Sequence, residues 1–395
     1  MSRKLIDHSP DLKRLVDQGY TVSIKGGYVV IADIPYVDPD RNVQRGVLVS
    51  RLESDGQKAV KPSDHVVYFV GAHPCKSDGT QIGGLGRTEA RVHVAEGLDT
   101  QHQFSARPTD PNGFLNYYDK IANYVALIYP HARKIEPAAT PKMFRPVTPA
   151  DDEETVFKYV DTASSRANIV ALSEKLKQGR LAIVGLGGTG SYVLDLIAKT
   201  HVPEIHLFDG DRLLAHNAFR APGAVPLEKL VEQPTKVAYH SEVYGAMRDG
   251  IIAHEFFIGS DSLNELDDMD FVFLCMEGDV KKSIVQHLEA RKKAFIDVGM
   301  GLFSTGDAIG GTLRVTTSMP EQREHVHAKH RIPLGERRPG QEYEQNIQIA
   351  DLNALNAALA VIKWKKLCGF YGDLKNEFHS TYTVVGNLLL NEDIR

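Results

Sequence analysis

The chain has 395 residues, which is enough for two domains that each have a hydrophobic core. Apolar residues make up 42% and charged residues 25%, a mixture typical of a soluble globular protein. The formal net charge of -5 argues against a general nucleic-acid binder, which needs an excess of Lys and Arg. The start has no apolar core of signal-peptide length, and no run reaches the roughly 18 apolar residues that span a bilayer. We therefore expect a cytoplasmic protein with neither nucleic-acid nor membrane partners.

The first part of the chain alternates short apolar runs with turn signals, which is typical of β-strands. A helix is predicted over 113–128, because apolar residues recur there at helical spacing. The Pro-rich segment 137–154 then resembles a linker. We expect an N-terminal α+β domain over 1–150 and a second domain over 151–395. The expected N-terminal strands are a hairpin over 20–37 and the runs 45–52, 65–71 and 90–97.

The second domain alternates strands and helices. This order predicts an α/β fold with a Rossmann-like, doubly wound, mainly parallel sheet. A charged segment rich in Pro and Gly, 318–346, is predicted to be a long crossover loop, followed by a helix over 349–367. The other expected elements are helices over 162–178, 191–200 and 281–292 and strands over 181–184, 204–208, 271–275 and 294–299.

A glycine-rich turn follows the first of these strands and opens a helix. The glycines permit a tight turn and let backbone N–H groups and the helix N-terminus approach phosphates. Asp209 lies at the end of the next strand, where a carboxylate can bind ribose hydroxyls. The turn alone does not separate a dinucleotide oxidoreductase from an ATP-using enzyme. The glycines of the predicted nucleotide site are Gly185, Gly187, Gly188 and Gly190.

Polar and charged residues after Asp209 favour ATP. The chain continues with Asp211, Asn217 and Arg220, then Lys236, and a later strand ends in Glu277-Gly278-Asp279. This combination resembles the E1-like (ThiF-type) adenylating enzymes, the family of the ubiquitin activators and of the sulfur-carrier activators. Their pattern is a glycine-rich turn, D-x-D, S-N-x-x-R, a Lys and a later D-N. The chain departs from it with His216 in place of Ser and Val280 in place of Asn.

The resemblance covers about 162–370 and implies a role for each matching residue. Asp209 takes the ribose position with Asp211 beside it, and Asn217, Arg220 and Lys236 take the positions that hold the triphosphate. Asp279 takes the position of the Asp that organises Mg²⁺. Attack of a carboxylate on the α-phosphate expels pyrophosphate, so cations must stabilise both groups. Arg220 and Lys236 are available for this, and ATP with Mg²⁺ is the expected ligand pair.

Arg166 precedes the first strand, where these enzymes carry an arginine that reaches the ATP of the neighbouring subunit. The resemblance therefore implies a homodimer. An ordinary Arg on a helix surface remains the alternative.

Many E1 enzymes transfer the activated carboxylate to a cysteine in the crossover loop, but 318–346 contains none. Cys368 follows a helix C-terminus, where the dipole raises a thiol pKa, and Cys275 lies in a strand expected to be buried. Cys75, in a polar turn, is the one expected to be exposed. We hypothesise that the protein forms an acyl-adenylate without a thioester of its own. In the loop, His325, His327 and His330 fit either a zinc site or, more simply, a solvated basic segment.

The N-terminal region offers no chemical motif. Its position before the adenylating domain resembles bacterial E1-like proteins found beside E2-like, ubiquitin-like and JAB-peptidase partners in antiphage (Bil-type) operons. That resemblance implies adenylation of the C-terminus of a ubiquitin-like protein, with an E2-like protein as acceptor. The alternatives are activation of a sulfur-carrier protein or small carboxylate by the same chemistry, and an NAD-dependent oxidoreductase.

Overall fold

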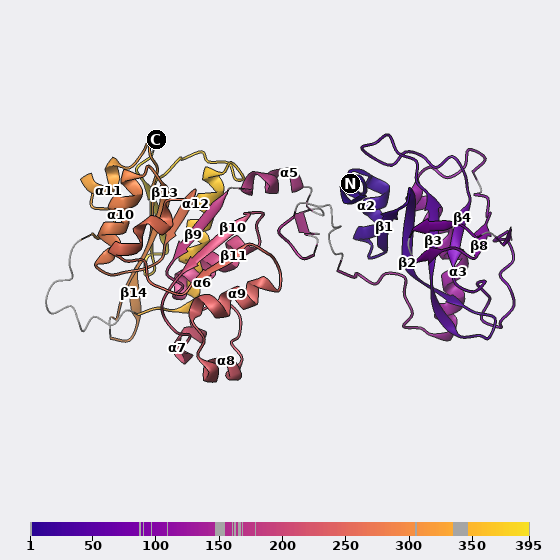
Figure 1. The fold of residues 1–395 in the computed structure, drawn as a ribbon, viewed down its shortest axis with the longest axis horizontal. Helices are drawn as coiled ribbons and strands as arrows, with labels where there is room; N and C mark the ends of the chain where they lie inside the picture. Colours follow the sequence, from indigo (N-terminus) through magenta and orange to yellow (C-terminus); the bar gives the residue numbers. More distant parts are fainter. Residues whose placement is uncertain are drawn as a thin grey trace. The chain divides into compact units, whose positions relative to one another are not determined.

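The computed structural model describes residues 2–86, 88–89, 91–95, 97–108, 110–146, 155–159, 161, 163–164, 167, 169–177, 179–304, 306–334 and 347–394. The chain forms two compact units, Met1–Glu154 and Thr155–Arg395 (Figure 1). Each unit has its own buried apolar clusters. Within the described residues, no helix is long and apolar enough to cross a membrane.

The first unit is built on an antiparallel six-stranded sheet in the order β1-β2-β3-β4-β8-β5. The helices α1 (Ser2–His8), α2 (Pro10–Asp17) and α3 (Tyr117–Ile135) accompany it. The run predicted as a strand over 90–97 instead contributes β6 (His93–Ala95) to a separate ribbon with β7 (Leu98–Asp99). The sheet strands are β1 (Thr21–Lys25), β2 (Tyr28–Val37), β3 (Val43–Arg51), β4 (Val67–Val70), β5 (Thr88–Glu89) and β8 (His102–Phe104).

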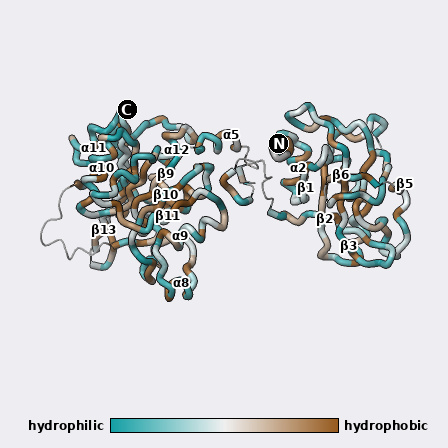
Figure 2. Tube along the Cα trace, in the orientation of Figure 1, coloured by the Kyte–Doolittle hydropathy of each residue, from teal (hydrophilic) through white to brown (hydrophobic). Residues whose placement is uncertain are grey.

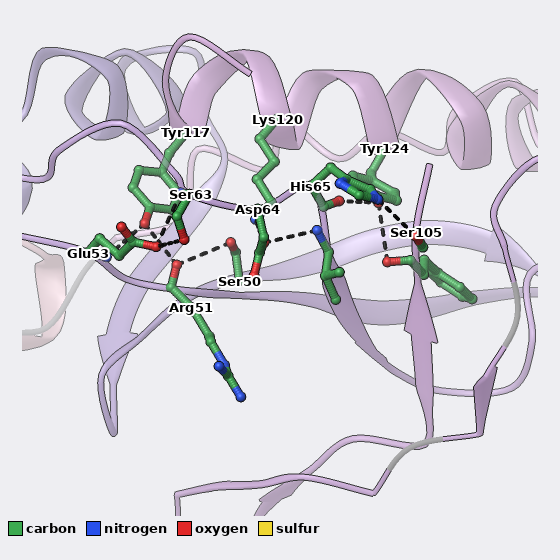
Figure 3. A network of polar contacts seen from close by, with 12 residues as sticks. Ser50, Arg51, Glu53, Ser63, Asp64, His65, Ser105, Tyr117, Lys120 and Tyr124 are labelled. Carbon is green, nitrogen blue, oxygen red and sulfur yellow. Dashed lines mark hydrogen bonds and ion pairs between the residues drawn. The ribbon is translucent and has the colours of Figure 1, made fainter. Parts of the chain in front are cut away.

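Polar side chains on one face of α3 form hydrogen bonds and an ion pair with the chain at the end of β3 and with the segment just before β4 (Figure 3). The Tyr117 hydroxyl donates to Arg51 O at 2.8 Å and accepts from Glu53 N at 2.8 Å. Lys120, 1% exposed, donates to Asp64 Oδ1 at 2.8 Å, and the Tyr124 hydroxyl donates to His65 O at 2.6 Å. The three helical residues are spaced at i, i+3 and i+7, so they share one face.

The second unit contains an eight-stranded sheet in the order β11-β10-β9-β12-β13-β14-β15-β16. The strands from β11 to β13 are parallel, and β14 to β16 extend the sheet by antiparallel pairing. The predicted α/β class is confirmed, while the antiparallel extension was not predicted. The strands are β9 (Arg180–Val184), β10 (Glu204–Phe208), β11 (Ile251–His254), β12 (Phe271–Leu274), β13 (Ala294–Ser304), β14 (Ile309–Ser318), β15 (His379–Thr383) and β16 (Leu388–Glu392).

Apolar clusters cover both faces of this sheet, as expected for a doubly wound fold. On one face α6 (Gly188–Ala198) and α12 (Ala350–Leu367) pack together over β9, with Trp364 in the core. On the other face α10 (Val280–Ala290) contributes Ile284, Val285 and Leu288. Figure 2 shows β9 and β10 as hydrophobic segments between these layers. The remaining helices are α5 (Val170–Ser173), η1 (Glu174–Leu176), α7 (Ala215–Ala218), α8 (Leu227–Glu232), α9 (Lys236–Gly245), η2 (Ser260–Leu266) and α11 (Glu324–Ala328).

Two predicted segments differ from the observed elements. Among the described residues of 162–178, the longest helical pieces are the short α5 and η1, so a continuous helix was the wrong prediction. The segment predicted as a loop over 318–346 contains the helix α11. Arg323 holds the start of α11 by donating to Met319 O at 3.0 Å and Glu289 O at 3.0 Å, a tertiary contact without a periodic sequence signal.

Candidate functional site

The strand order in the sheet of the second unit reverses between β9 and β12. From β9 the chain passes through α6 to β10 on one side, whereas β12 pairs with the other edge of β9. Such a switch point leaves a crevice outside the carboxyl ends of the strands, where doubly wound folds bind ligands.

The glycine-rich turn occupies this switch point. Gly185 has a φ of +93°, which favours glycine, and its N–H donates to Phe208 O at 2.8 Å. A Cβ at Gly190 would lie 1.9 Å from Gly185 O, so the first turn of α6 can approach the strand end only without a side chain there. Gly187 is the N-cap of α6, and Gly188 begins the helix. The helix N-terminus therefore opens into the crevice, where its dipole favours an anion.

Asp209 and Lys236 connect this turn to the end of β10. Asp209 is 4% exposed, and its Oδ2 accepts from Leu186 N at 2.7 Å. Its Oδ1 accepts from Asp211 N at 2.8 Å. The Lys236 ammonium lies 3.5 Å from Asp209 Oδ2 and 2.6 Å from Asp211 Oδ2. A buried cation thus lies beside the turn, with Asp211 at the solvent side of the cluster.

Asn217 and Arg220 follow on α7 and the turn after it. Asn217 Oδ1 accepts from Leu214 N at 2.9 Å, which caps the start of the short helix. Burial lowers the pKa of the Arg220 guanidinium, and the Asp211 carboxylate opposes that shift. Arg220 Nε is buried with no hydrogen-bond partner among the described residues.

A small pocket of about 90 Å³ adjoins the turn on the side of β12 and β13. Of the two acidic residues after β12, Glu277 lines the pocket. Asp279, to which the sequence resemblance assigned the metal, is exposed at the N-cap of α10. Both acidic residues occur in Glu277-Gly278-Asp279, but the sequence does not reveal which one lines the pocket. The pocket is lined by Gly187, Gly188, Thr189, Cys275, Met276, Glu277, Val298, Gly299, Met300, Gln348 and Asn356.

A buried ionic triad lies behind this pocket and was not predicted. Asp297 on β13 is 0% exposed, with Lys281 Nζ 2.8 Å from its Oδ1 and Arg314 Nη2 2.6 Å from its Oδ2. A Cβ at Gly299 would lie 2.4 Å from Arg314 Nη2, so this glycine makes room for the guanidinium. The triad connects β13, whose residues Val298 to Met300 line the pocket, to α10 and β14.

The cysteines differ from expectation in one respect. Cys75 was expected to be exposed, but it is 1% exposed, because its backbone bridges Val37 and Gln81 and its side chain packs against Val37 and Ala132. Burial raises the pKa of all three thiols, that of Cys368 to about 12. Cys275 lies just after β12 and lines the pocket. These shifts disfavour a thiolate at neutral pH.

The three loop histidines do not converge. His325 is 5% exposed and faces Phe378, whereas His327 Nε2 lies 2.9 Å from Glu289. His330 follows in a left-handed turn with a φ of +49°. The described residues contain no group of three or more metal-ligating side chains. Arg166, proposed to reach a neighbouring subunit, lies outside the described residues.

The fold and the turn define the second unit as a nucleotide-binding α/β unit. The sequence profile of the ThiF family matches residues 164–392, and the chain belongs to this family. That membership supports E1-like, ATP-dependent adenylation of a carboxylate and disfavours the oxidoreductase alternative. A domain of unknown function, DUF6791, matches residues 10–162.

Solved structures with a similar fold include PaaA and Escherichia coli MccB. PaaA is 17% identical, with 57% of this chain and 76% of PaaA covered at a TM-score of 0.43. MccB with succinimide is 16% identical, with 60% and 72% covered at a TM-score of 0.45. MccB with ATP is 17% identical, with 57% and 67% covered at a TM-score of 0.42. A search of curated proteins found no match.

Proposed function

We propose that the second unit adenylates the C-terminal carboxylate of a ubiquitin-like protein, with ATP as the donor. The observation that carries this proposal is the cluster at the switch point, where the glycine turn, Asp209 and the buried Lys236 are joined by hydrogen bonds and ion pairs. Asp209 and Asp211 hold this cation beside the turn, where it can pair with the phosphates that the glycine turn and the helix N-terminus favour.

The chemistry follows from the charges at the site. The carboxylate of the substrate attacks the α-phosphorus, the bond to the bridging oxygen breaks, and pyrophosphate leaves with both electrons. Negative charge grows on the α-phosphate and on the leaving group. Lys236 and the free Nε donor of Arg220 stabilise it, and no side chain acts as nucleophile.

Mg²⁺ fits the acidic residues near this site. Mg²⁺ is commonly held by one or two carboxylates together with substrate phosphates, so it requires no cage of three ligands. Glu277, which lines the pocket, and Asp279 on the same turn would hold it. When bound, the ion would neutralise charge on the phosphates.

The further parts of the proposal concern partners. An E2-like protein would accept the activated C-terminus, as in Bil-type antiphage operons, because all three thiols of this chain have raised pKa values. Activation of a sulfur carrier or small carboxylate is the alternative with the same site. A homodimer would allow Arg166 of one subunit to reach the ATP of the other.

ATP–pyrophosphate exchange tests the proposal. Exchange should depend on a ubiquitin-like carrier and be lost in Lys236→Ala and Arg220→Ala. Lys229→Ala is the matched control, because this nearby lysine pairs with Glu242 on the surface. Exchange with a small carboxylate but no carrier would favour the alternative. Exchange that Lys236→Ala leaves unchanged would refute the assigned site.

A further inference from the structure

The first turns of α12 place two asparagines against the glycine turn and β13. Asn353 and Asn356 are both 0% exposed, although the neighbouring buried positions Ala357 and Ala360 are apolar. Asn353 Oδ1 lies 3.0 Å from Thr189 Oγ1, and a Cβ at Gly188 would lie 2.1 Å from Asn353 Nδ2. Asn353 therefore holds the start of α6, whereas Asn356 faces the pocket.

The side-chain amide of Asn356 uses its NH₂ group in a hydrogen bond, whereas its carbonyl oxygen has no partner among the described residues. Its Nδ2 donates to Gly299 O at 3.1 Å, and this contact fixes the amide orientation, because a carbonyl can only accept. Its Oδ1 is buried and has no hydrogen-bond partner among the described residues. Leaving a buried acceptor without a partner has a free-energy cost. A ligand that supplies a donor would recover that cost.

The free Oδ1 defines what this ligand must offer. An acceptor requires an N–H or O–H group. The ATP phosphates expected at the helix N-terminus offer neither at neutral pH, and the ribose hydroxyls are expected at Asp209, just after β10. The other substrate of the proposed reaction offers a donor, since a peptide chain carries an amide N–H next to its terminal carboxylate. The pocket of about 90 Å³ holds roughly three water molecules, and Gly187, Gly188 and Gly299 line it without side chains. This space suits a small terminal residue.

We propose that Asn356 is a substrate-binding residue, whose Oδ1 accepts the last amide N–H of a peptide-like carboxylate substrate. The hydrogen bond would place the terminal carboxylate toward the N-terminus of α6, because Gly187 and Gly188 line the same pocket. This inference rests on the proposed function for the identity of the second substrate. It adds how the chain recognises that substrate, separately from the nucleotide.

The test uses two synthetic octapeptides that end in Gly-Gly and differ in the last linkage, an amide in one and an ester in the other. The ester removes the N–H with little change in shape. With ATP-saturated full-length protein, the amide peptide should bind about tenfold more tightly, the effect of one hydrogen bond of about 1.4 kcal/mol. In Asn356→Leu and Asn356→Ala the two peptides should bind equally. Asp351→Ala, on the exposed face of the same helix, should keep the preference.

An amide preference that survives in both Asn356 variants, with ATP binding and thermal unfolding as in the wild type, would overturn the proposal. Absence of binding by both peptides would overturn it as well, while Lys236-dependent exchange with another carboxylate would preserve adenylation at this site with a different substrate. An Asn356-dependent preference without exchange by any carrier would instead support this inference and refute the adenylation reaction.

Discussion

Lys236 donates a hydrogen bond of 2.6 Å to Asp211 at the point where the second strand of the sheet meets the glycine turn. The same ammonium lies 3.5 Å from the buried carboxylate of Asp209. The cation is thus held by carboxylates before any phosphate arrives, which keeps it in place and limits reorganisation on binding.

Replacement of Lys236 by Met should weaken ATP binding. The change removes the cation beside the helix N-terminus and leaves the Asp209 charge buried without it. Charged hydrogen bonds contribute about 1.5–3 kcal/mol, so the Kd for ATP should rise at least about tenfold. Titration calorimetry measures this, with Lys229→Met as the control. Equal Kd values for wild type and Lys236→Met would show that Lys236 does not contact the nucleotide.

Two glycine substitutions in the turn should differ in stability. In Gly190→Ala the new Cβ would meet Gly185 O at 1.9 Å, so the backbone must shift. In Gly187→Ala the Cβ has no described atom within 4 Å. We expect Gly190→Ala to lower the Tm of the second unit by about 5 °C and Gly187→Ala by much less. Calorimetric scans of both variants check this. Equal Tm values would contradict the tight packing of the turn.

Removal of the central carboxylate of the buried triad should destabilise the second unit. Asp297→Asn leaves the buried Lys281 and the partly buried Arg314 without their carboxylate, at a cost of about 3–5 kcal/mol. Asp268→Asn, which removes an exposed partner of Arg180, should cost less than about 1 kcal/mol. Urea unfolding gives both values. A small effect of Asp297→Asn would mean that solvent screens the triad.

Stability of the second unit should depend on pH through two histidines. Burial lowers the pKa of His240 and that of His379 to about 4, from an ordinary value of 6.5. The unfolded chain then binds more protons than the folded chain between these values, so the free energy of unfolding should fall as the pH drops from 6.5 to 4. Urea unfolding at several pH values measures this slope. The slope should decrease in His240→Gln, and an unchanged slope would exclude His240 as a contributor.

Carrier-dependent exchange should not require Cys75 or Cys368. Cys75 and Cys368 are packed in apolar surroundings that raise their thiol pKa values. Single Ala variants at the two positions should therefore keep the exchange rate, and no DTT-sensitive adduct with the carrier should form. A DTT-sensitive adduct that disappears in Cys75→Ala or Cys368→Ala would show that a thioester step exists.

The sequence predicted the parallel strands β9, β10, β12 and β13 and the turn because their signals are local, whereas the parallel strand β11 was not predicted. The strand at 181–184 is a continuous apolar run, the strand at 204–208 buries Ile205, Leu207 and Phe208, and the glycines between the two strands have a fixed steric role. The strands β15 and β16 gave no such signal. The exposed leucines of β16 do not alternate with polar residues, and its pairing with β15 is a tertiary contact.

The parts of the site that the sequence did not reveal depend on orientation. Glu277 and Asp279 are two residues apart, and only the turn after β12 determines which of the two residues lines the pocket. Asn353 and Asn356 had a weaker signal, two polar residues at i and i+3 within an apolar stretch of helix. That pattern fits a solvated face as well as a buried one, so packing against α6 was needed to distinguish them.

The most direct test of adenylation is the product itself. The full-length protein is incubated with ATP, Mg²⁺ and a ubiquitin-like carrier, and the carrier is analysed by mass spectrometry together with the released phosphates. Adenylation at a switch-point site predicts a carrier that gains one adenylyl group at its C-terminal carboxylate, with release of pyrophosphate, and no gain with Lys236→Ala. Release of ADP and inorganic phosphate, or turnover of NADH, with an unmodified carrier would contradict it.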